Sequence, residues 1–182
     1  MKRKALWLTQ TAVMLAALIT LQWLTKPLGQ IVTGSCVNAV LAVAVLFVGM
    51  SSGVTVALLS PVFAFLFGIA PQILTVPAIM IGNTVFVVLL RLVTDDLKTV
   101  WKSVAAVLLA AVCKFAVLYG LVTYVICGVL ADGLLAQGLL KEAMLTALPA
   151  TFSMPQLITA LIGGGLAVAI VPLLKKAWHK LF

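Results

Sequence analysis

Residues 101–130 read WKSVAAVLLAAVCKFAVLYGLVTYVICGVL, a long apolar run with one lysine, Lys114, near its middle. An α-helix rises about 1.5 Å per residue, so Lys114 lies roughly 20 Å from Trp101, close to the midplane of a hydrocarbon core about 30 Å thick. The run holds no acidic residue that could pair with this lysine. Charges at that depth are costly and normally serve a partner or a ligand. The run therefore predicts a membrane-spanning helix in which Lys114 holds an anionic ligand.

The composition of the whole chain points to the same class of protein. Of the 182 residues, 64% are hydrophobic and 9% are charged, and the mean hydropathy is +1.29. Soluble domains average about 45–50% apolar and about 25% charged residues. The sequence therefore predicts one integral membrane domain over residues 1–182. This length allows six helices of about 20 residues with short loops, and it leaves no room for a soluble catalytic domain.

Apolar segments separated by glycine, proline and polar residues predict an all-α fold with six transmembrane helices. Their expected bounds are 6–24, 36–48, 54–67, 76–93, 101–130 and 154–174. The polar stretch from Lys26 to Ser35 is expected to form the first loop, which either folds over a site or simply connects two helices. Residues 132–154 are expected to form another loop, with a short helix along the membrane interface.

The distribution of basic residues predicts the orientation of these helices. With both termini in the cytoplasm, the outer face carries Lys26 and Lys141, and Lys114 stays inside the membrane. The inner face then holds the remaining nine basic residues, namely Lys2, Arg3, Lys4, Arg91, Lys98, Lys102, Lys175, Lys176 and Lys180. Cytoplasmic loops are enriched in lysine and arginine, so we expect a multi-pass protein with both ends in the cytoplasm.

The sequence lacks the residues that several kinds of chemistry require. The one histidine, His179, lies in the basic tail, and the four acidic residues lie outside the apolar runs, so neither a catalytic triad nor a metal site can be assembled. No phosphate-binding GxxxxGK[ST] motif is present. The basic residues cluster at helix ends, which argues for topology rather than for nucleic-acid binding. We therefore expect no enzyme activity, no cofactor and no nucleic-acid partner.

Depth and helical phase select the candidate ligand residues. Asn83 lies roughly 14 Å from the inner end of helix 76–93, a depth similar to that of Lys114. In the last helix, polar or small residues share one face at spacings of three, four and seven. Others lie where the second helix and the first loop could close the site from above. The full candidate set is Lys114, Asn83, Asn38, Gln30, Thr33, Gln156, Thr159 and Gly163.

These residues predict a cavity rich in amides and hydroxyls, with one positive charge and no negative charge. Because an unpaired buried charge is costly, a small carboxylate-bearing nutrient would complete such a cavity. The alternative for Lys114 is a structural role, in which its long side chain reaches the interface or bonds a backbone carbonyl.

The first helix carries a pair of small residues, Ala12 and Ala16, four positions apart and therefore on one face. Small residues at this spacing let another helix approach closely. The face is expected either to dock a partner protein or to pack inside this chain.

Taken together, these features resemble the substrate-binding S components of energy-coupling factor (ECF) transporters, the vitamin-uptake class. The resemblance covers nearly the whole chain: six helices with both ends inside, a polar first loop, the motif AVMLA at 12–16, and a glycine-rich last helix with GGGLA at 163–167 and PLLKK at 172–176. It implies a bacterial cell-membrane protein that binds one small nutrient from outside, with the site built from the first loop and helices 4, 5 and 6. It also implies a transmembrane coupling subunit and two ABC-type ATPases as partners, with Ala12 and Ala16 on the docking surface.

Two other classes stay open at this point. One is a stand-alone channel or facilitator in which Lys114 lines a path for an anionic solute. The other is a membrane assembly subunit without a ligand. Tight, stoichiometric retention of a small molecule would distinguish an S component from both. No motif in the sequence identifies the substrate.

Overall fold

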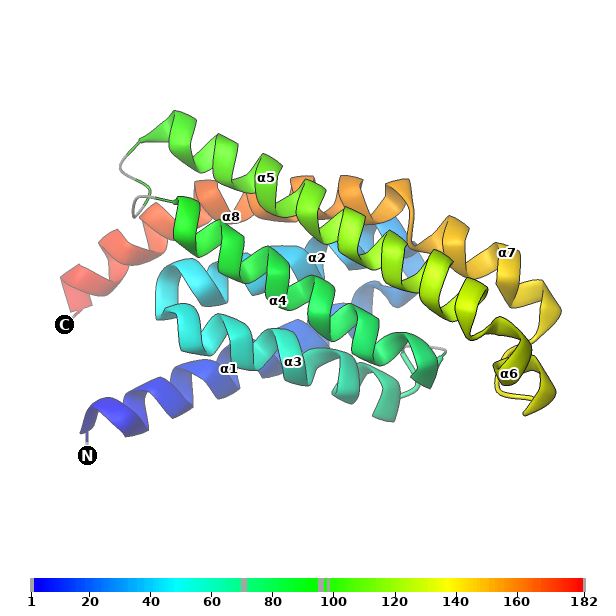
Figure 1. Ribbon diagram of the computed structural model, residues 1–182. Helices are drawn as coiled ribbons and strands as arrows, with labels where there is room; N and C mark the ends of the chain where they lie inside the picture. The colour runs from blue at the N-terminus through cyan, green and yellow to red at the C-terminus, as the bar shows by residue number, and fades with distance from the viewer. Residues whose placement is uncertain (1, 70–71, 95–96, 98, 182) are drawn as a thin grey trace.

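The computed structural model describes residues 2–69, 72–94, 97 and 99–181, and every regular element in this part of the chain is helical. Long helical segments run back and forth along one axis and form a bundle (Figure 1). They are α1 (Lys2–Thr25), α2 (Gln30–Val43) continued by η2 (Ala44–Val48), α3 (Met50–Leu66), α4 (Val76–Val93), α5 (Val100–Tyr119) continued by η4 (Gly120–Val129), and α8 (Met154–Leu181). Short helices connect them, namely η1 (Lys26–Leu28), η3 (Ile73–Thr75), α6 (Ala131–Ala136) and α7 (Glu142–Thr151).

The described residues form five helical segments that are long and apolar enough to cross a membrane. The remaining long segment, α3, is a shorter apolar helix of 17 residues. Large apolar side chains also lie on the outside of the bundle, for example Leu8 (63% exposed) on α1 and Leu166 (48% exposed) on α8. A soluble protein would bury such faces, whereas lipid tails cover them favourably. These features indicate an all-α, multi-pass membrane protein.

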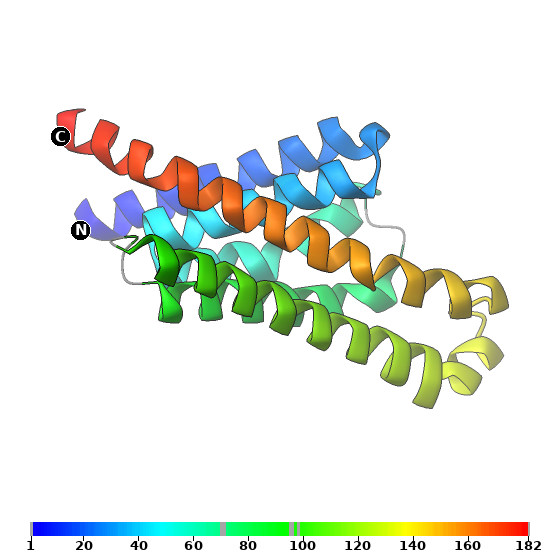
Figure 2. The ribbon, with the colours of Figure 1, turned by 90° about the horizontal axis from the view of Figure 1, so that it is seen from above.

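The helices are arranged around α2, which packs against α1, α3, α4 and α8. On one side α4 packs between α3 and α5, and α5 in turn packs against α8. The N- and C-termini lie at the same end of the long axis in both views, and the connection from α4 to α5 lies at that end too (Figures 1 and 2). The connections from α1 to α2 and from α3 to α4, together with α6 and α7, lie at the opposite end (Figure 1).

Two apolar clusters divide the interior along the same axis. The larger cluster, which includes the fully buried Leu41, Val45 and Leu90, joins α1 to α5 and α8. The smaller cluster, which includes Leu118 and Val122, packs η4 against α7 and the start of α4 at the end away from the termini. The polar site described below lies where the two clusters meet.

The expected first loop is largely helical, which corrects the predicted start of the second helix at residue 36. Gly29 adopts a φ of 90°, a left-handed conformation that favours glycine, and it ends the turn after α1. The next helix begins at once, with Gln30. Gly34 does not break this helix. A Cβ on Gly34 would lie 2.8 Å from Cγ2 of Thr159, so this glycine allows α2 and α8 to touch.

Other predicted bounds change for similar reasons. The third helix begins at Met50, four residues before the predicted start, because Gly53 packs against Val45 instead of forming a turn. It also continues through Pro61 as one helix. The last helix extends to Leu181, beyond the predicted end at 174. The fourth helix, 76–93, is confirmed.

The predicted loop at 132–154 contains two short helices, α6 and α7, and the acidic residues Asp132 and Glu142 lie in their first turns. Some residues of the charge arguments lie outside the described part of the chain, namely Asp95, Asp96, Lys98 and the side chains of Lys2, Arg3 and His179.

Candidate binding site

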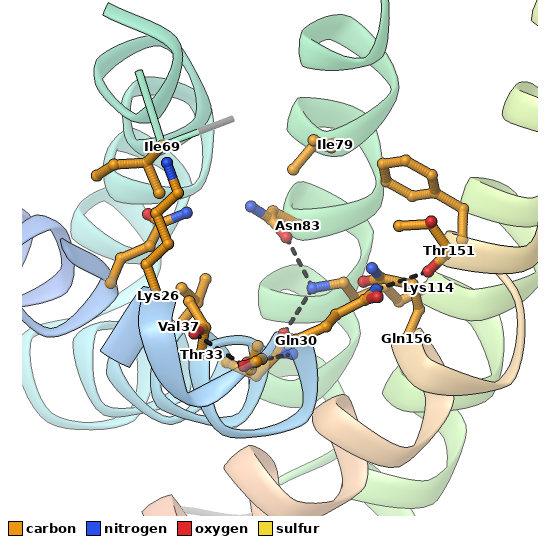
Figure 3. A pocket seen from close by; sticks show the side chains of 15 residues that line it. Lys26, Gln30, Thr33, Val37, Ile69, Ile79, Asn83, Lys114, Thr151 and Gln156 are labelled. Carbon is orange, nitrogen blue, oxygen red and sulfur yellow. Dashed lines mark hydrogen bonds between the residues drawn. The ribbon is translucent and has the colours of Figure 1, made fainter. Parts of the chain in front are cut away.

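Lys114 is buried in the middle of the bundle, with 2% of its surface exposed. Its Nζ donates one hydrogen bond to Oδ1 of Asn38 over 2.5 Å and another to Oδ1 of Asn83 over 2.7 Å (Figure 3). The ring of Phe86 lies below the ammonium, with its centroid 5.4 Å from Nζ. The lysine therefore joins α5 to α2 and α4 through two amide oxygens and one aromatic face.

The close packing of α4 against α5 allows Asn83 to reach Lys114. A Cβ on Gly82 would lie 2.5 Å from Cγ of Leu118, so a larger residue would force the Leu118 side chain to shift. Gly82 precedes Asn83, and Leu118 is one helical turn beyond Lys114 on the same face. Close packing at this pair therefore brings the asparagine within reach of the lysine.

The amide of Asn38 is held with its oxygen towards the lysine. Its Nδ2 donates to the Gly34 carbonyl over 2.9 Å and to Oγ1 of Thr159 over 3.3 Å. The Thr159 hydroxyl in turn donates to the Gln156 carbonyl over 3.2 Å. Both hydrogens of the Asn38 amide are thus used on α2 and α8, which leaves the oxygen to accept from Lys114.

The positive charge of Lys114 has no ionic partner among the described residues. Its two hydrogen-bond acceptors are neutral amides, and no carboxylate in this part of the chain pairs with it. An ammonium carries three donors, and two of them are accounted for. One donor and one full positive charge therefore remain to be matched.

A cavity of about 340 Å³ lies next to the lysine (Figure 3). Several of its lining residues belong to α7 and to the turn after α1, which lie at the end of the bundle away from the termini (Figure 1). The polar and apolar residues that line the cavity come from the end of α1 and the turn after it, from α2, α4 and α5, from the segment after α3, and from α7, α8 and their connection. They are Gln22, Lys26, Gly29, Gln30, Thr33, Gly34, Val37, Asn38, Ile69, Ile79, Asn83, Lys114, Thr151, Phe152 and Gln156. None of them is acidic. The side-chain amide of Gln156 makes no hydrogen bond within the described residues and is a second donor group for a ligand.

Two hydrogen bonds cross the mouth of the cavity. Nζ of Lys26 donates to the Gly68 carbonyl over 2.7 Å, which ties the end of α1 to the end of α3. Nε2 of Gln30 donates to the Thr151 carbonyl over 2.7 Å, which ties the start of α2 to the end of α7 (Figure 3). Because neither bond is buried, both can exchange with water when a solute passes.

Six of the eight residues predicted from the sequence line this cavity, namely Lys114, Asn83, Asn38, Gln30, Thr33 and Gln156. Thr33 also fixes the α1–α2 turn, because its hydroxyl donates to the Thr25 carbonyl over 2.8 Å. Thr159 is buried behind the lining and acts through Asn38.

Gly163 does not line the cavity, which corrects its predicted role. A Cβ there would lie 2.6 Å from the Ala39 nitrogen, from Asn38 Cβ and from the Ser35 oxygen. It therefore lies at a close contact between α8 and α2.

The sequence reading missed several lining residues, including Gln22, Lys26, Thr151 and Phe152. Gln22 could have been predicted from the sequence, because an amide near the end of an apolar helix needs a polar partner. Thr151 and Phe152 could not have been predicted, because their position depends on how α7 folds back over the end of the bundle. The helix 1 pair, Ala12 and Ala16, is exposed on the outside, whereas Thr11 on the inner face bonds the Ser52 hydroxyl over 3.0 Å.

The cavity offers hydrogen-bond donors to a ligand, namely an ammonium and side-chain amides. No group of three or more His, Cys, Asp or Glu residues is close enough to hold a metal ion within the described ranges. Comparisons of the chain with protein-family models, with curated proteins and with solved structures found no match.

Proposed function

We propose that this protein binds a small carboxylate-bearing nutrient from outside the cell and acts as the substrate-binding component of an ATP-driven ECF importer. One observation carries the ligand class: a buried ammonium, held by two neutral amide oxygens, borders a cavity without a single acidic residue. A carboxylate at Lys114 would accept the remaining ammonium hydrogen and neutralise the charge. The unbonded amide of Gln156 would offer a further donor.

The proposed topology has six membrane spans, both termini in the cytoplasm and the cavity facing outside. At 17 residues, α3 is about 26 Å long by helical rise, close to the thickness of a hydrocarbon core. The end of the bundle that holds both termini also carries most of the basic residues in the chain. The positive-inside rule favours the cytoplasm for that end.

Packing below the lysine favours a binding protein over a channel. Phe86, Leu90 and Ala110, which lie between Lys114 and the end with the termini, are all 0% exposed. A solute that enters the cavity therefore meets a packed core. Release on the inner side requires a large movement of the protein, which is the task of the proposed coupling subunit and ATPases. The bacterial cell membrane is the proposed location.

The proposal is tested by purifying the wild-type protein in mild detergent and measuring retained small molecules by native mass spectrometry. We expect one carboxylate-bearing molecule per chain. Lys114→Met keeps the apolar stem and removes the charge, so we expect at least a tenfold loss of affinity, about 1.4 kcal/mol, with the fold retained. Lys141→Met is the matched control, because it makes the same change at an exposed lysine outside the cavity and should leave the affinity unchanged.

Two results would contradict the proposal. Unchanged retention in Lys114→Met would mean that the lysine is structural. No retained molecule in the wild type, together with ion conductance in vesicles, would favour the channel. For the partner assignment, the protein is reconstituted with an ECF coupling subunit and two ATPases, and ATP-dependent uptake of the retained molecule is expected.

A further inference from the structure

A second, smaller hollow adjoins the main cavity. This recess has a volume of about 50 Å³ and shares Gln22 and Asn83 with the cavity. It adds residues of α3 that the cavity does not include, namely Ser60, Pro61 and Ala64. The recess thus extends the polar site towards α1 and α3, on the side of Asn83 opposite to Lys114.

Ser60 is buried here without a hydrogen-bond partner. It is 2% exposed, and its hydroxyl makes no bond to any described residue. Several other hydroxyls in the long helices bond the carbonyl four residues earlier, as Thr55 and Thr84 do over 2.8 and 2.7 Å, whereas the buried hydroxyls of Ser60 and Thr123 make no such bond. Because a buried, unpaired hydroxyl is unfavourable, Ser60 is a candidate hydrogen-bond partner for a polar group of a ligand.

Two side-chain amides that line the recess also have N–H groups without a hydrogen-bond acceptor among the described residues. The oxygen of Asn83 accepts from Lys114, whereas its nitrogen points the other way and makes no hydrogen bond within the described residues (Figure 3). The side chain of Gln22 makes none either. The recess therefore offers a hydroxyl and two amides and no charged side chain.

We propose that Ser60, Gln22 and the amide nitrogen of Asn83 form a second polar subsite, which takes a neutral hydroxyl or carbonyl group of the ligand whose carboxylate lies at Lys114. This inference rests on the proposed function and narrows its substrate class to carboxylates with such a group some distance away. Asn83 links the two subsites, because its oxygen orients the lysine and its nitrogen faces the recess.

The size and charge of the recess determine what it can hold. Its volume is comparable to the roughly 30 Å³ that one water occupies in the liquid, so it admits one small group, while the 340 Å³ cavity holds the rest of the molecule. With no charged lining residue, an ionised group would be left unpaired there. A neutral group with a lone pair, and with a hydrogen where it is a hydroxyl, satisfies both the amides and Ser60.

The test uses benzoate, 3-hydroxybenzoate and 4-hydroxybenzoate as probes of the purified protein, with dissociation constants measured by calorimetry. We expect one hydroxylated isomer to bind wild type about three- to tenfold more tightly than benzoate, as one added hydrogen bond implies. Ser60→Ala should abolish this preference and leave benzoate affinity unchanged. Ser103→Ala is the matched control: Ser103 is 1% exposed and far from the recess, and its hydroxyl already bonds the Thr99 carbonyl.

Two outcomes overturn the inference. One is a preference for a hydroxybenzoate that survives Ser60→Ala, which would place the hydroxyl elsewhere and leave only water in the recess. The other is that wild type binds the three probes with equal affinity or binds none of them. Neither outcome contradicts the proposed function. That function is tested separately, by whether wild type retains a small molecule that Lys114→Met loses.

Discussion

Nζ of Lys114 on α5 lies 2.7 Å from Oδ1 of Asn83 on α4, 31 residues earlier in the chain. The pair joins a charged donor to a neutral acceptor, so it orients the ammonium without neutralising it. Hydrogen bonds to charged groups contribute about 1.5–3 kcal/mol, and the loss of one in a buried site leaves the charge less well solvated. The pair therefore stabilises the protein and keeps the charge available to an anion.

Asn83→Leu tests the structural half of that statement. Removal of the amide should lower the free energy of unfolding by about 2 kcal/mol, because Lys114 then retains Asn38 as its only hydrogen-bond partner among the described residues. The measurement is unfolding in mixed detergent micelles. In a Lys114→Met background the same change should cost less than about 0.5 kcal/mol, because no charge is left to solvate. Equal losses in both backgrounds would show that the two residues are not coupled.

Gly163→Ala tests the contact between α8 and α2. The added methyl group would lie 2.6 Å from backbone atoms of Ser35 and Ala39, which cannot move without shifting α2. Overpacking of this kind costs about 1–3 kcal/mol, so thermal unfolding in detergent should move to lower temperature. Gly165→Ala is the control two residues away, where a Cβ meets nothing within 4 Å. Alanine favours helix over glycine, and an equal loss in both variants would contradict the packing argument.

Ala12→Trp combined with Ala16→Trp tests the proposed docking surface. Both alanines are exposed, so the isolated protein should keep its stability and its ligand affinity. Uptake by the reconstituted importer should be lost, because two indole rings prevent close approach of a partner helix. The control is Ala105→Trp with Leu109→Trp, an exposed pair at the same spacing on α5. Lost ligand binding with intact assembly would show that this face serves the fold of the chain itself.

Introduced cysteines test the topology. Lys176→Cys, near the end that holds both termini, and Lys141→Cys, at the opposite end, are made after Cys36, Cys113 and Cys127 are replaced by alanine. An impermeant maleimide added to intact cells should label residue 141 and spare residue 176. Permeabilised cells should show both, which controls for reactivity. Labelling of residue 176 in intact cells would reverse the proposed orientation.

Much of this architecture can be read from the order of the residues. The apolar runs specify helices of membrane-spanning length, because backbone groups in lipid must be satisfied within the segment. The depth of Lys114 and Asn83 follows from helical rise, and the structure brings the two side chains together as that depth predicts. These inferences need only the geometry of one helix at a time.

Other features depend on how the helices pack. Gly34 lies in a stretch predicted to be a loop, and Gly163 was predicted to line the ligand site, yet both glycines lie where α2 touches α8. Ser60 is one residue of an apolar run in the sequence, and only the arrangement of α1, α3 and α4 shows that its hydroxyl lies unpaired beside Gln22 and Asn83. In the same way, the fold of α7 brings Thr151 and Phe152 to the mouth.

By itself, the sequence determined the class of protein, the helices and the depth of the one intramembrane charge, because these depend on local hydrophobicity and a fixed rise per residue. Tertiary structure alone decided which polar groups meet that charge and which stay unpaired. Two helices fit closely where a small residue on one helix meets a side chain or the backbone of the other, and that pairing is a property of both surfaces together, which neither segment of sequence contains.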